Sequence, residues 1–310
     1  MTASAFAALV DWGTSNLRIW LVDSQGAVLG ERQSPEGMGS LDKAAYPAVL
    51  EGHLSALGAP SDLPVVVAGM AGARTGWREA PYVETPAPLV GLFQHAVQPE
   101  GVNRPVYILP GVCQREGGAY DVMRGEETQL AGALEQGLGD ALFCLPGTHS
   151  KWALVEGGQV RRFSTVMTGE LFNLISRQSI LRLSVPEDGD AEADPDIFDA
   201  AVDQALEPGF ALTSVLFSIR AESLLAGQGA KVNPAARLSG LLIGAEIAAI
   251  RDDLLRHGKA YLIGTGKLTR LYARAITKAG GEPVLLDGGL LVRRGLLASA
   301  LSLFDHEFKD

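Results

Sequence analysis

Two glycine–threonine turns contain the residues best suited to bind an anion. The first is in DWGTSNLR, where Gly13 and Thr14 follow an apolar run that ends at Asp11. The second is in LPGTHSKW, where Gly147 and Thr148 follow another apolar run. Glycine lets a ligand approach the backbone, and successive N–H groups of a turn form a nest for an anion. Both turns could therefore hold phosphate groups.

A third turn and one carboxylate extend this pattern. The segment LIGTGKLT ends another apolar run with Gly264, Thr265 and Gly266. Asp11 would repel a phosphate directly, but it can hold Mg²⁺ that bridges phosphate oxygens. Each turn alone is more simply an ordinary hairpin, because Gly and Asn are common turn residues. The pair of turns half a chain apart, together with the third, favours a phosphate site.

Other common sites are poorly supported. In GTGKLT, Leu268 follows Lys267 where a P-loop needs Ser or Thr, and the third glycine of a dinucleotide fingerprint is missing. There is no G-x-S-x-G nucleophile motif, which argues against a serine hydrolase. The five histidines are scattered without metal-ligand spacing.

Length and charge limit the class of protein. The 310 residues are enough for two domains with separate cores. The net charge of −10 gives no general attraction to nucleic acid or to an anionic membrane, and the two cysteines support neither a disulfide framework nor a zinc site. No signal peptide or membrane-spanning run is evident. We therefore expect a cytoplasmic protein with no nucleic-acid or membrane partner.

The elements that position the turns repeat in the two halves. Each half is expected to begin with a three-strand meander that contains a Gly-Thr turn, and to continue with alternating strands and helices. The predicted helices cover residues 44–57, 125–138, 169–181, 214–227, 239–258, 267–280 and 290–304. The acidic stretch 186–196 is interpreted as a solvated surface loop. This order predicts an α/β fold with mixed sheets flanked by helices.

Six segments resemble one known family. They are DWGTSNLR, GMAGARTGWREAPY, DVMRGEETQ, LPGTHSKW, MTGELF and LIGTGKLTRLY. In this order they resemble the 2-dehydro-3-deoxygalactonokinase family, within the actin, sugar-kinase and heat-shock-chaperone ATPase superfamily. One departure is Thr265, which stands where many superfamily members have glycine.

The resemblance implies a fold and a nucleotide site. It implies two similar ribonuclease-H-like lobes with a ligand cleft between them, 1–124 and 125–310, with a closing helix at 290–310 that packs back on the first lobe. ATP and Mg²⁺ are the implied cofactors, with Asp11 as the metal-ordering group. The implied ATP-binding residues are Gly13, Thr14, Ser15, Asn16, Gly147, Thr148, His149, Ser150, Lys151, Gly264, Thr265 and Gly266. Lys151 either adds positive charge or is an exposed strand residue.

A catalytic base is implied in RGEETQ, at the start of the helix that links the lobes. Phosphoryl transfer to an alcohol needs a group that accepts the hydroxyl proton. By resemblance, Glu126 matches the carboxylate of glycerol-type kinases and Glu127 matches that of hexokinases. We favour Glu126. The alternative is that both glutamates only cap the helix.

The implied substrate is a small sugar acid, whose carboxylate calls for arginine. Arg74 follows Gly72 in GMAGARTGWREAPY, with Trp77 as an apolar wall and Glu79 or Tyr82 as hydroxyl partners. Arg124 is the alternative anchor. We expect Arg18 to brace the first turn, and Trp12 and Trp20 to lie in the core.

The leading hypothesis is an ATP-dependent kinase that acts on the 6-hydroxyl of 2-dehydro-3-deoxy-D-galactonate. The alternatives are a kinase for another sugar or sugar acid, and a non-catalytic nucleotide-switched binding protein. The base-bearing helix and the arginine-rich turn favour the kinases. The sequence leaves open the configuration at C4 of the substrate and the formation of a homodimer.

Overall fold

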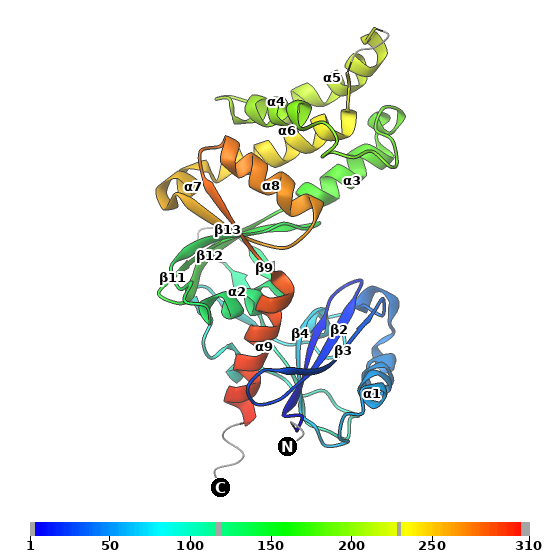
Figure 1. Ribbon diagram of the computed structural model, residues 1–310, viewed down its shortest axis with the longest axis vertical. Coiled ribbons are helices and arrows are strands. Elements are labelled where there is room, and N and C mark those ends of the chain that lie inside the picture. The colour runs from blue at the N-terminus through cyan, green and yellow to red at the C-terminus, as the bar shows by residue number, and fades with distance from the viewer. Residues whose placement is uncertain (1–3, 116–118, 228–230, 305–310) are drawn as a thin grey trace. The chain divides into compact units, whose positions relative to one another are not determined.

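The computed structural model describes residues 4–115, 119–227 and 231–304 (Figure 1). The chain forms two compact units. The first comprises Met1–Asp140, Val155–Phe163 and Gly288–Asp310, and the second comprises Ala141–Leu154 and Ser164–Asp287. Each unit is described by itself below.

The first unit is built on a five-stranded sheet of order β3-β2-β1-β4-β7. Strands β1 to β3 form an antiparallel meander, whereas β4 and β7 run parallel to β1. The bounds are β1 Ala7–Trp12, β2 Leu17–Val22, β3 Val28–Ser34, β4 Val65–Gly69 and β7 Val106–Ile108. The sheet is therefore mixed, as expected.

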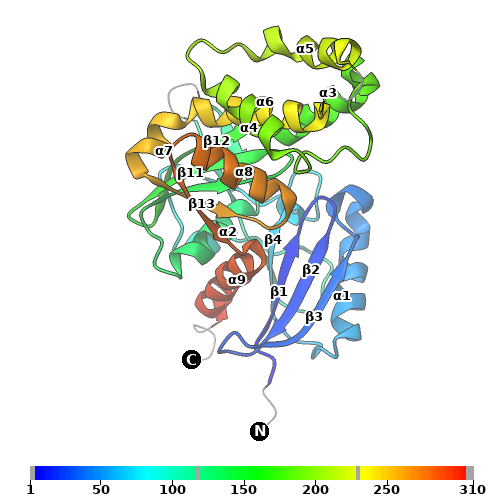
Figure 2. The ribbon, with the colours of Figure 1, turned by 45° about the horizontal axis from the view of Figure 1, so that its top comes forward.

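Side chains of β1 alternate between two buried layers, because successive residues of a strand point to opposite faces. Ala8 and Val10 pack in a core with helix α1 (Tyr46–Ala56). Ala7 and Leu9 pack in another core with helix α9 (Gly288–Phe304). Figure 2 shows α1 beside the meander. The end of β1, where Asp11 lies, is thus fixed from both faces of the sheet.

Helix α2 (Glu126–Leu134) packs very closely against α9. A Cβ atom on Gly132 would lie 1.9 Å from the carbonyl oxygen of Leu291, and one on Gly295 would lie 2.0 Å from that of Thr128. Only glycine fits at these two positions. Figure 1 shows the two helices side by side.

Several short elements complete the first unit. A three-stranded sheet has the order β5-β8-β9 and leads into α2. Its strands are β5 Tyr82–Glu84, β8 Gly111–Gln114 and β9 Asp121–Met123, and strand β6 covers Ala87–Pro88. The 3-10 helices are η1 Met38–Ser40, η2 Lys43–Ala45, η3 Met70–Gly72 and η4 Leu92–His95.

The second unit contains strands in the order β14-β13-β10-β11-β12, with β10, β13 and β14 parallel. Strands β11 and β12 each run from one unit into the other, and in the first unit the start of β12 pairs with β6. The bounds are β10 Ala141–Leu145, β11 Ser150–Glu156, β12 Gln159–Val166, β13 Lys259–Ile263 and β14 Glu282–Leu286.

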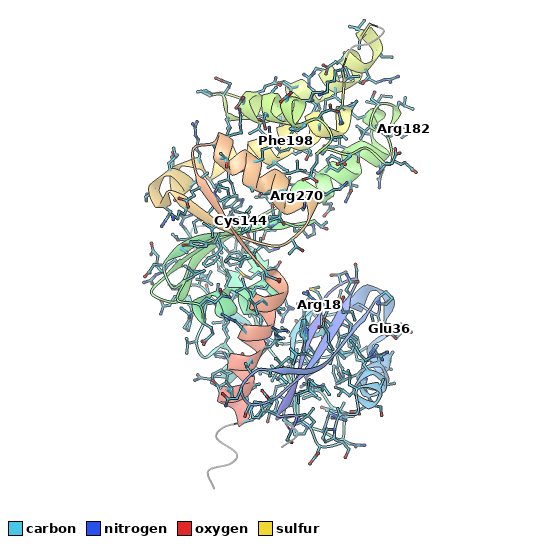
Figure 3. All side chains as sticks on the ribbon, viewed as in Figure 1. Arg18, Glu36, Cys144, Arg182, Phe198 and Arg270 are labelled. Atoms are coloured by element: carbon cyan, nitrogen blue, oxygen red, sulfur yellow. The ribbon has the colours of Figure 1, made fainter. Side chains whose placement is uncertain are left out.

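Helices pack on the strands of the second unit and on one another. A core formed by β10, α4, α6 and α8 contains Phe198, which is completely buried (Figure 3). The helices are α3 Thr168–Gln178, α4 Pro195–Leu206, α5 Leu212–Leu225, α6 Pro234–Ala249, α7 Arg251–His257 and α8 Lys267–Lys278, with the 3-10 helix η6 at Ile180–Leu183. Among the described residues, no helix is long and apolar enough to cross a membrane.

The predicted α/β class with mixed sheets and flanking helices is confirmed. Trp12 and Trp20 lie in the core, as expected. Three details differ. The helix expected at 239–258 is broken at Ile250, helix α4 was not predicted, and the helix expected at 125–138 ends at Leu134. The division into lobes 1–124 and 125–310 stays a prediction.

Candidate functional site

The first Gly-Thr turn is held by backbone hydrogen bonds. The N–H of Gly13 donates to the carbonyl oxygen of Asn16 at 2.8 Å, which closes the turn between β1 and β2. Met38 donates to the carbonyl of Gly13 at 3.0 Å, and Gly39 donates to that of Thr14 at 2.8 Å. The carbonyls are thus occupied, whereas the side chains of residues 14–16 are exposed.

The segment that supports this turn leaves no room for a side chain. A Cβ atom on Gly37 would lie 2.4 Å from the carbonyl oxygen of Thr14 and 2.4 Å from the carbonyl carbon of Ser15. A hollow opens on the turn, lined by Asp11, Gly13, Thr14, Ser15, Asn16, Leu17, Arg18, Gln33, Ser34 and Pro35.

Asp11 lies opposite Arg18 in the β1–β2 ladder and forms an ion pair with it. The Nε atom of Arg18 donates to Oδ2 of Asp11 at 3.1 Å, and Nη2 of the same arginine donates to the same oxygen. The guanidinium also lies 5.6 Å from the ring centre of Trp20. The expectation that Arg18 braces the turn agrees with these contacts.

The surroundings of Asp11 fit a magnesium ion that is coordinated mainly by phosphate oxygens and water and by few protein side chains. The described residues contain no cluster of three or more His, Cys, Asp or Glu side chains that could form a complete metal site. Mg²⁺ in phosphate-transfer sites typically keeps several waters and binds one or two carboxylates plus phosphate oxygens. A single carboxylate beside the hydroxyls of Thr14 and Ser15 meets that requirement.

The second Gly-Thr turn is backed by the first turn of helix α3. A Cβ atom on Gly169 would lie 2.6 Å from the carbonyl oxygen of Gly147 and 2.8 Å from the Cα of Thr148. The N–H of Glu170 donates to the carbonyl of Thr148 at 2.9 Å, and the carboxylate of Glu170 contacts Nε2 of His149. Thr148 and His149 remain exposed at the tip of the turn.

The two residues after this turn are buried. Lys151 is only 6% exposed, and its ammonium group donates to the carbonyl of His149 at 3.4 Å. It is therefore not an exposed strand residue. The hydroxyl of Ser150 lies 2.8 Å from Oε1 of Glu246, a buried carboxylate that the sequence analysis did not single out.

The third turn connects β13 to α8. Gly264 and Gly266 have φ angles of 157° and 84°, and Gly266 caps the start of α8. The N–H of Gly264 donates to the carbonyl of Leu286 on the neighbouring strand. The residues of this turn are at least partly accessible to solvent.

A cavity of ≈ 390 Å³ lies within the second unit, next to the second turn and the start of α8. Gly147 and Thr148 form part of its wall, together with residues of α3, α6 and α8. The apolar part of the wall includes Phe172 and Leu271. The cavity thus joins apolar surface to the Gly-Thr turn.

The acidic stretch 186–196 is largely exposed, which agrees with a surface loop, but two of its acids make specific contacts. Asp190 and Glu192 line the cavity. Lys267 donates to Asp190 at 3.0 Å, and Arg270, which is labelled in Figure 3, binds both carboxylate oxygens of Glu192 at 2.8 Å. These bonds lower the pKa of both acids. The regular spacing of acids in this loop and of bases in α8 was the sequence signal that could have predicted the contact.

The two candidate bases at the start of α2 differ in accessibility. Glu127 is 1% exposed, and both of its oxygens accept from the N–H of Gly125 at 2.8 and 2.9 Å. Burial, with the neighbouring Glu126, raises the pKa of Glu127 to about 8. Glu126 is only half-buried, and the N–H of Arg124 donates to it at 3.0 Å. Glu127 thus caps the helix, whereas Glu126 is accessible.

The start of α2 lies next to the end of β4 and close to Asp11. A Cβ atom on Gly125 would lie 3.3 Å from the Cα of Gly69. A Cβ atom on Gly69 would in turn lie 3.6 Å from Oδ1 of Asp11. The first unit therefore brings the carboxylate of β1 and the glutamates of α2 into one neighbourhood.

Arg124 is a buried cation with incomplete hydrogen bonding. It is 9% exposed, its Nη2 donates to the carbonyl of Ala80 at 2.8 Å, and its guanidinium lies 4.3 Å from the ring centre of Tyr82. Within the part of the chain that the structure describes, its Nε and Nη1 atoms have no hydrogen-bond partner. Gly72 makes room for Nη1, because a Cβ atom there would lie 2.8 Å from it.

The other predicted substrate residues lie elsewhere in the first unit. Arg74 is 87% exposed at its side chain and pairs with Glu79 at 3.5 Å. Trp77 is only 5% exposed and stacks on Tyr46, with ring centres 5.8 Å apart. Trp77 therefore offers little surface for an apolar wall, and its role as a substrate contact stays a prediction.

Residues 11–299 match the sequence model of the 2-keto-3-deoxy-galactonokinase family. The chain belongs to this family. It is 44% identical over 305 residues to a protein of Rhizobium meliloti (strain 1021) named "Probable 2-dehydro-3-deoxygalactonokinase", covering 98% of this chain and 99% of the relative. It is 35% identical over 300 residues to the 2-dehydro-3-deoxygalactonokinase of Escherichia coli (strain K12), covering 97% and 98%.

Solved structures agree on the fold. A crystal structure of a Sinorhizobium meliloti protein, provisionally assigned as a 2-dehydro-3-deoxygalactonokinase, matches with a TM-score of 0.89 at 44% identity, over 96% of this chain and 99% of that chain. The activator of 2-hydroxyisocaproyl-CoA dehydratase from Clostridium difficile, solved with bound ADPNP, matches with a TM-score of 0.50 at 13% identity, over 98% and 96%. The predicted actin-like ATPase and sugar-kinase fold is confirmed.

Proposed function

We propose that this protein is a kinase that transfers the γ-phosphate of ATP to the 6-hydroxyl of 2-dehydro-3-deoxy-D-galactonate. Family membership and the names of the relatives at 44% and 35% identity support the reaction class and the sugar acid. The observation that carries the proposal is the accessible carboxylate of Glu126 at a helix start packed beside the strand of Asp11. A non-catalytic binding protein would not need that carboxylate.

The phosphates of ATP are bound by residues 13–16 and 147–151 in this proposal. The exposed hydroxyls of Thr14, Ser15 and Thr148 and the backbone N–H groups of the two turns supply donors. The backbone contacts behind both turns hold those donors in place before the ligand arrives. Pre-positioned donors stabilise the charge of a transferring phosphoryl group at little reorganisation cost. Asp11 would hold Mg²⁺, which neutralises charge on the phosphate oxygens.

The nucleoside is bound by residues 264–266 and the cavity of the second unit. Apolar residues such as Leu271 offer a surface for a base, and Gly147 and Thr148 in the same wall connect it to the phosphates. This mixture of apolar walls and few polar groups is typical of small-molecule sites.

Glu126 is the proposed general base. Glu127 is already engaged by the N–H of Gly125 through both oxygens, and its raised pKa keeps it protonated near neutral pH. A protonated, enclosed carboxyl cannot accept a proton from a substrate hydroxyl. Glu126 retains the accessibility that a base needs.

The substrate carboxylate is proposed to bind an arginine of the first unit. Arg124 is favoured over Arg74, because two nitrogens of Arg124 have no hydrogen-bond partner among the described residues, while Arg74 already pairs with Glu79. A buried guanidinium with unbonded donors gains most from a carboxylate ligand. Tyr82, which lies under the Arg124 guanidinium, would line the same site.

A coupled assay tests the function. Purified protein is given Mg²⁺, ATP and a panel of 2-keto-3-deoxy sugar acids that differ at C4, with neutral hexoses and glycerol as controls. We expect ADP release with the galactonate-derived acid to exceed that with neutral sugars by at least roughly 10²-fold in kcat/KM, since a buried arginine left without its carboxylate is costly. Equal rates across the panel would contradict the proposed substrate. Gel filtration and cell fractionation would test the predicted dimer and the cytoplasmic location.

A further inference from the structure

Glu246 is a buried carboxylate that the proposed reaction does not use. It lies on α6 in the apolar run LLIGAEIAAI and is 3% exposed. Burial raises its pKa, and hydrogen bonds from four side chains oppose that shift. A charged residue at such a position needs a structural or functional reason.

Four donors surround the two oxygens. Oε1 accepts from Nε1 of Trp152 at 2.7 Å and lies 2.8 Å from the hydroxyl of Ser150. Oε2 accepts from the hydroxyl of Tyr272 at 2.7 Å and from that of Thr168. An ionised carboxylate can accept from four donors, so this set matches its full capacity.

Three of the donors belong to segments that carry or support the glycine turns. Ser150 follows directly after the second Gly-Thr turn. Thr168 begins α3, whose next two residues, Gly169 and Glu170, contact that turn from behind. Tyr272 lies on α8, which starts immediately after the third turn. One carboxylate therefore connects the supports of both turns of the second unit.

We propose that Glu246 is a positioning residue that fixes the second and third glycine turns for nucleotide binding. The inference rests on the proposed function, because it assumes that these turns bind the nucleotide. Without the carboxylate, three hydroxyls and an indole N–H lose a shared acceptor, and each support can move independently. The donors would then no longer be held in place for the phosphates, and affinity for the nucleotide would fall.

The test is a set of isosteric variants measured by calorimetric titration with MgADP and by steady-state kinetics. Glu246→Gln keeps the side-chain volume, but its amide has only one oxygen that can accept hydrogen bonds in place of the two carboxylate oxygens. Thr168→Val and Tyr272→Phe each remove one donor and leave the carboxylate in place, so they test the inference even if Glu246→Gln fails to fold. Leu254→Ala is the control, since Leu254 is fully buried on α7 in the same unit and is not among the residues that line the cavity.

We expect Glu246→Gln to raise the Kd for MgADP by about tenfold and each single-donor variant by roughly threefold. The KM for the sugar acid should change less than twofold in all of them. Leu254→Ala should lower the thermal midpoint and leave both constants unchanged.

Three results would overturn the inference. If the wild-type protein binds MgADP and the Glu246 and Thr168 variants bind it equally well, Glu246 serves stability alone. The same conclusion holds if the Leu254 control raises the Kd as much as they do. If the wild-type protein does not bind MgADP, the proposed function fails first, and this inference fails with it.

Discussion

The two Gly-Thr turns are alike in sequence but differ in what surrounds them. In the first unit the turn is supported by the backbone of residues 37–39, and the carboxylates of Asp11 and Glu126 lie nearby. In the second unit the turn is supported by a helix start, and the residue two places before Gly147 is the apolar Leu145. A buried lysine, Lys151, follows that turn.

The difference suggests that the two turns have different roles in the proposed reaction. Carboxylates can hold a metal ion and accept a proton, and the two that are proposed for these roles, Asp11 and Glu126, lie in the first unit. The carboxylate of Glu170 beside the second turn instead contacts His149. The cavity with the apolar residues Phe172 and Leu271 in its wall lies beside the second turn. The proposed chemistry therefore depends on the first unit and the proposed affinity for nucleotide depends mainly on the second.

The largest expected effect concerns the base in the first unit. Glu126→Gln keeps the size of the side chain but cannot accept a proton, so kcat should fall roughly 10²–10⁴-fold with a modest change in KM. Glu127→Gln should cost far less, because Glu127 only caps the helix in this proposal. Steady-state kinetics of both variants measure the contrast.

If Glu127→Gln lowers kcat more than Glu126→Gln does, the base is Glu127. The two residues are adjacent in α2 and so project about 100° apart around its axis. Small and equal losses in both, with nucleotide and sugar-acid binding intact, would mean that neither is the base.

Asp11→Asn should have the next largest effect. Turnover at saturating ATP should fall roughly 10²-fold, and more Mg²⁺ should be needed for half-maximal rate, because the metal loses its carboxylate. Stability should change little, since the Asp11–Arg18 pair is partly exposed and such pairs contribute about 0–1 kcal/mol. A fall in thermal midpoint like that of a core mutation would instead support a structural role for Asp11.

A third prediction concerns how the stability contributed by the buried Glu127 and Glu246 depends on pH. The folded-state pKa of Glu127 is raised from 4.5 to about 8, so the folded protein binds its proton more tightly than the unfolded chain does. The stability from this group is fully present below about pH 4.5 and is lost as the pH rises through 8. The total is on the order of a few kcal/mol.

Denaturant unfolding of the wild type and of Glu127→Gln across that pH range measures this loss. The stability of the wild type relative to the variant should decrease as the pH rises from 5 to 8. The same comparison with Glu246→Gln should show a weaker slope, because four donors stabilise ionised Glu246. A flat difference for Glu127 would mean that its pKa is not raised.

The smallest expected effect comes from the glycines behind the turns. A Cβ atom on Gly37 or Gly169 would come within 2.4 to 2.6 Å of the backbone of its turn. Each alanine substitution should displace the turn and raise the KM for ATP by about tenfold, without a large change in the KM for the sugar acid. Gly52→Ala is a control, since nothing lies within 4 Å of its Cβ position. A normal KM for ATP in Gly169→Ala alone would break the proposed role of the second turn.

The parts of the fold that the sequence could predict are those with local signals. Turns such as Gly13–Thr14 follow strongly apolar strands, and the amphipathic pattern of 267–280 matches α8 closely. Boundaries set by long-range contacts were missed. The helix expected at 125–138 stops at Leu134. Helix α4 (Pro195–Leu206) was not predicted, because it begins within the acidic stretch that was interpreted as a loop.

The candidate site was predictable only where one turn supplies several residues. The contacts of Asp190 and Glu192 were not predicted, because their partners, Lys267 and Arg270, lie far away in the sequence. Trp77 looked like a ligand wall because no local pattern shows that it stacks on Tyr46. Glu246 did carry a signal, since a lone acid in an apolar helix requires buried partners. Its partners could be found only in three dimensions.

The close packing of α9 on α2 has a consequence for how the chain folds during synthesis. The helix that bears Glu126 is seated against residues made more than 150 positions later, through Gly132 and Gly295 and through a bond from Gln129 to the carbonyl of Gly288 that spans 159 positions. Contacts so distant in sequence form late, because the entropy of closing a long loop must be lost first. The ribosome must therefore release almost the entire chain before the candidate base can take its final position, so a nascent chain can fold its first meander long before it can acquire activity.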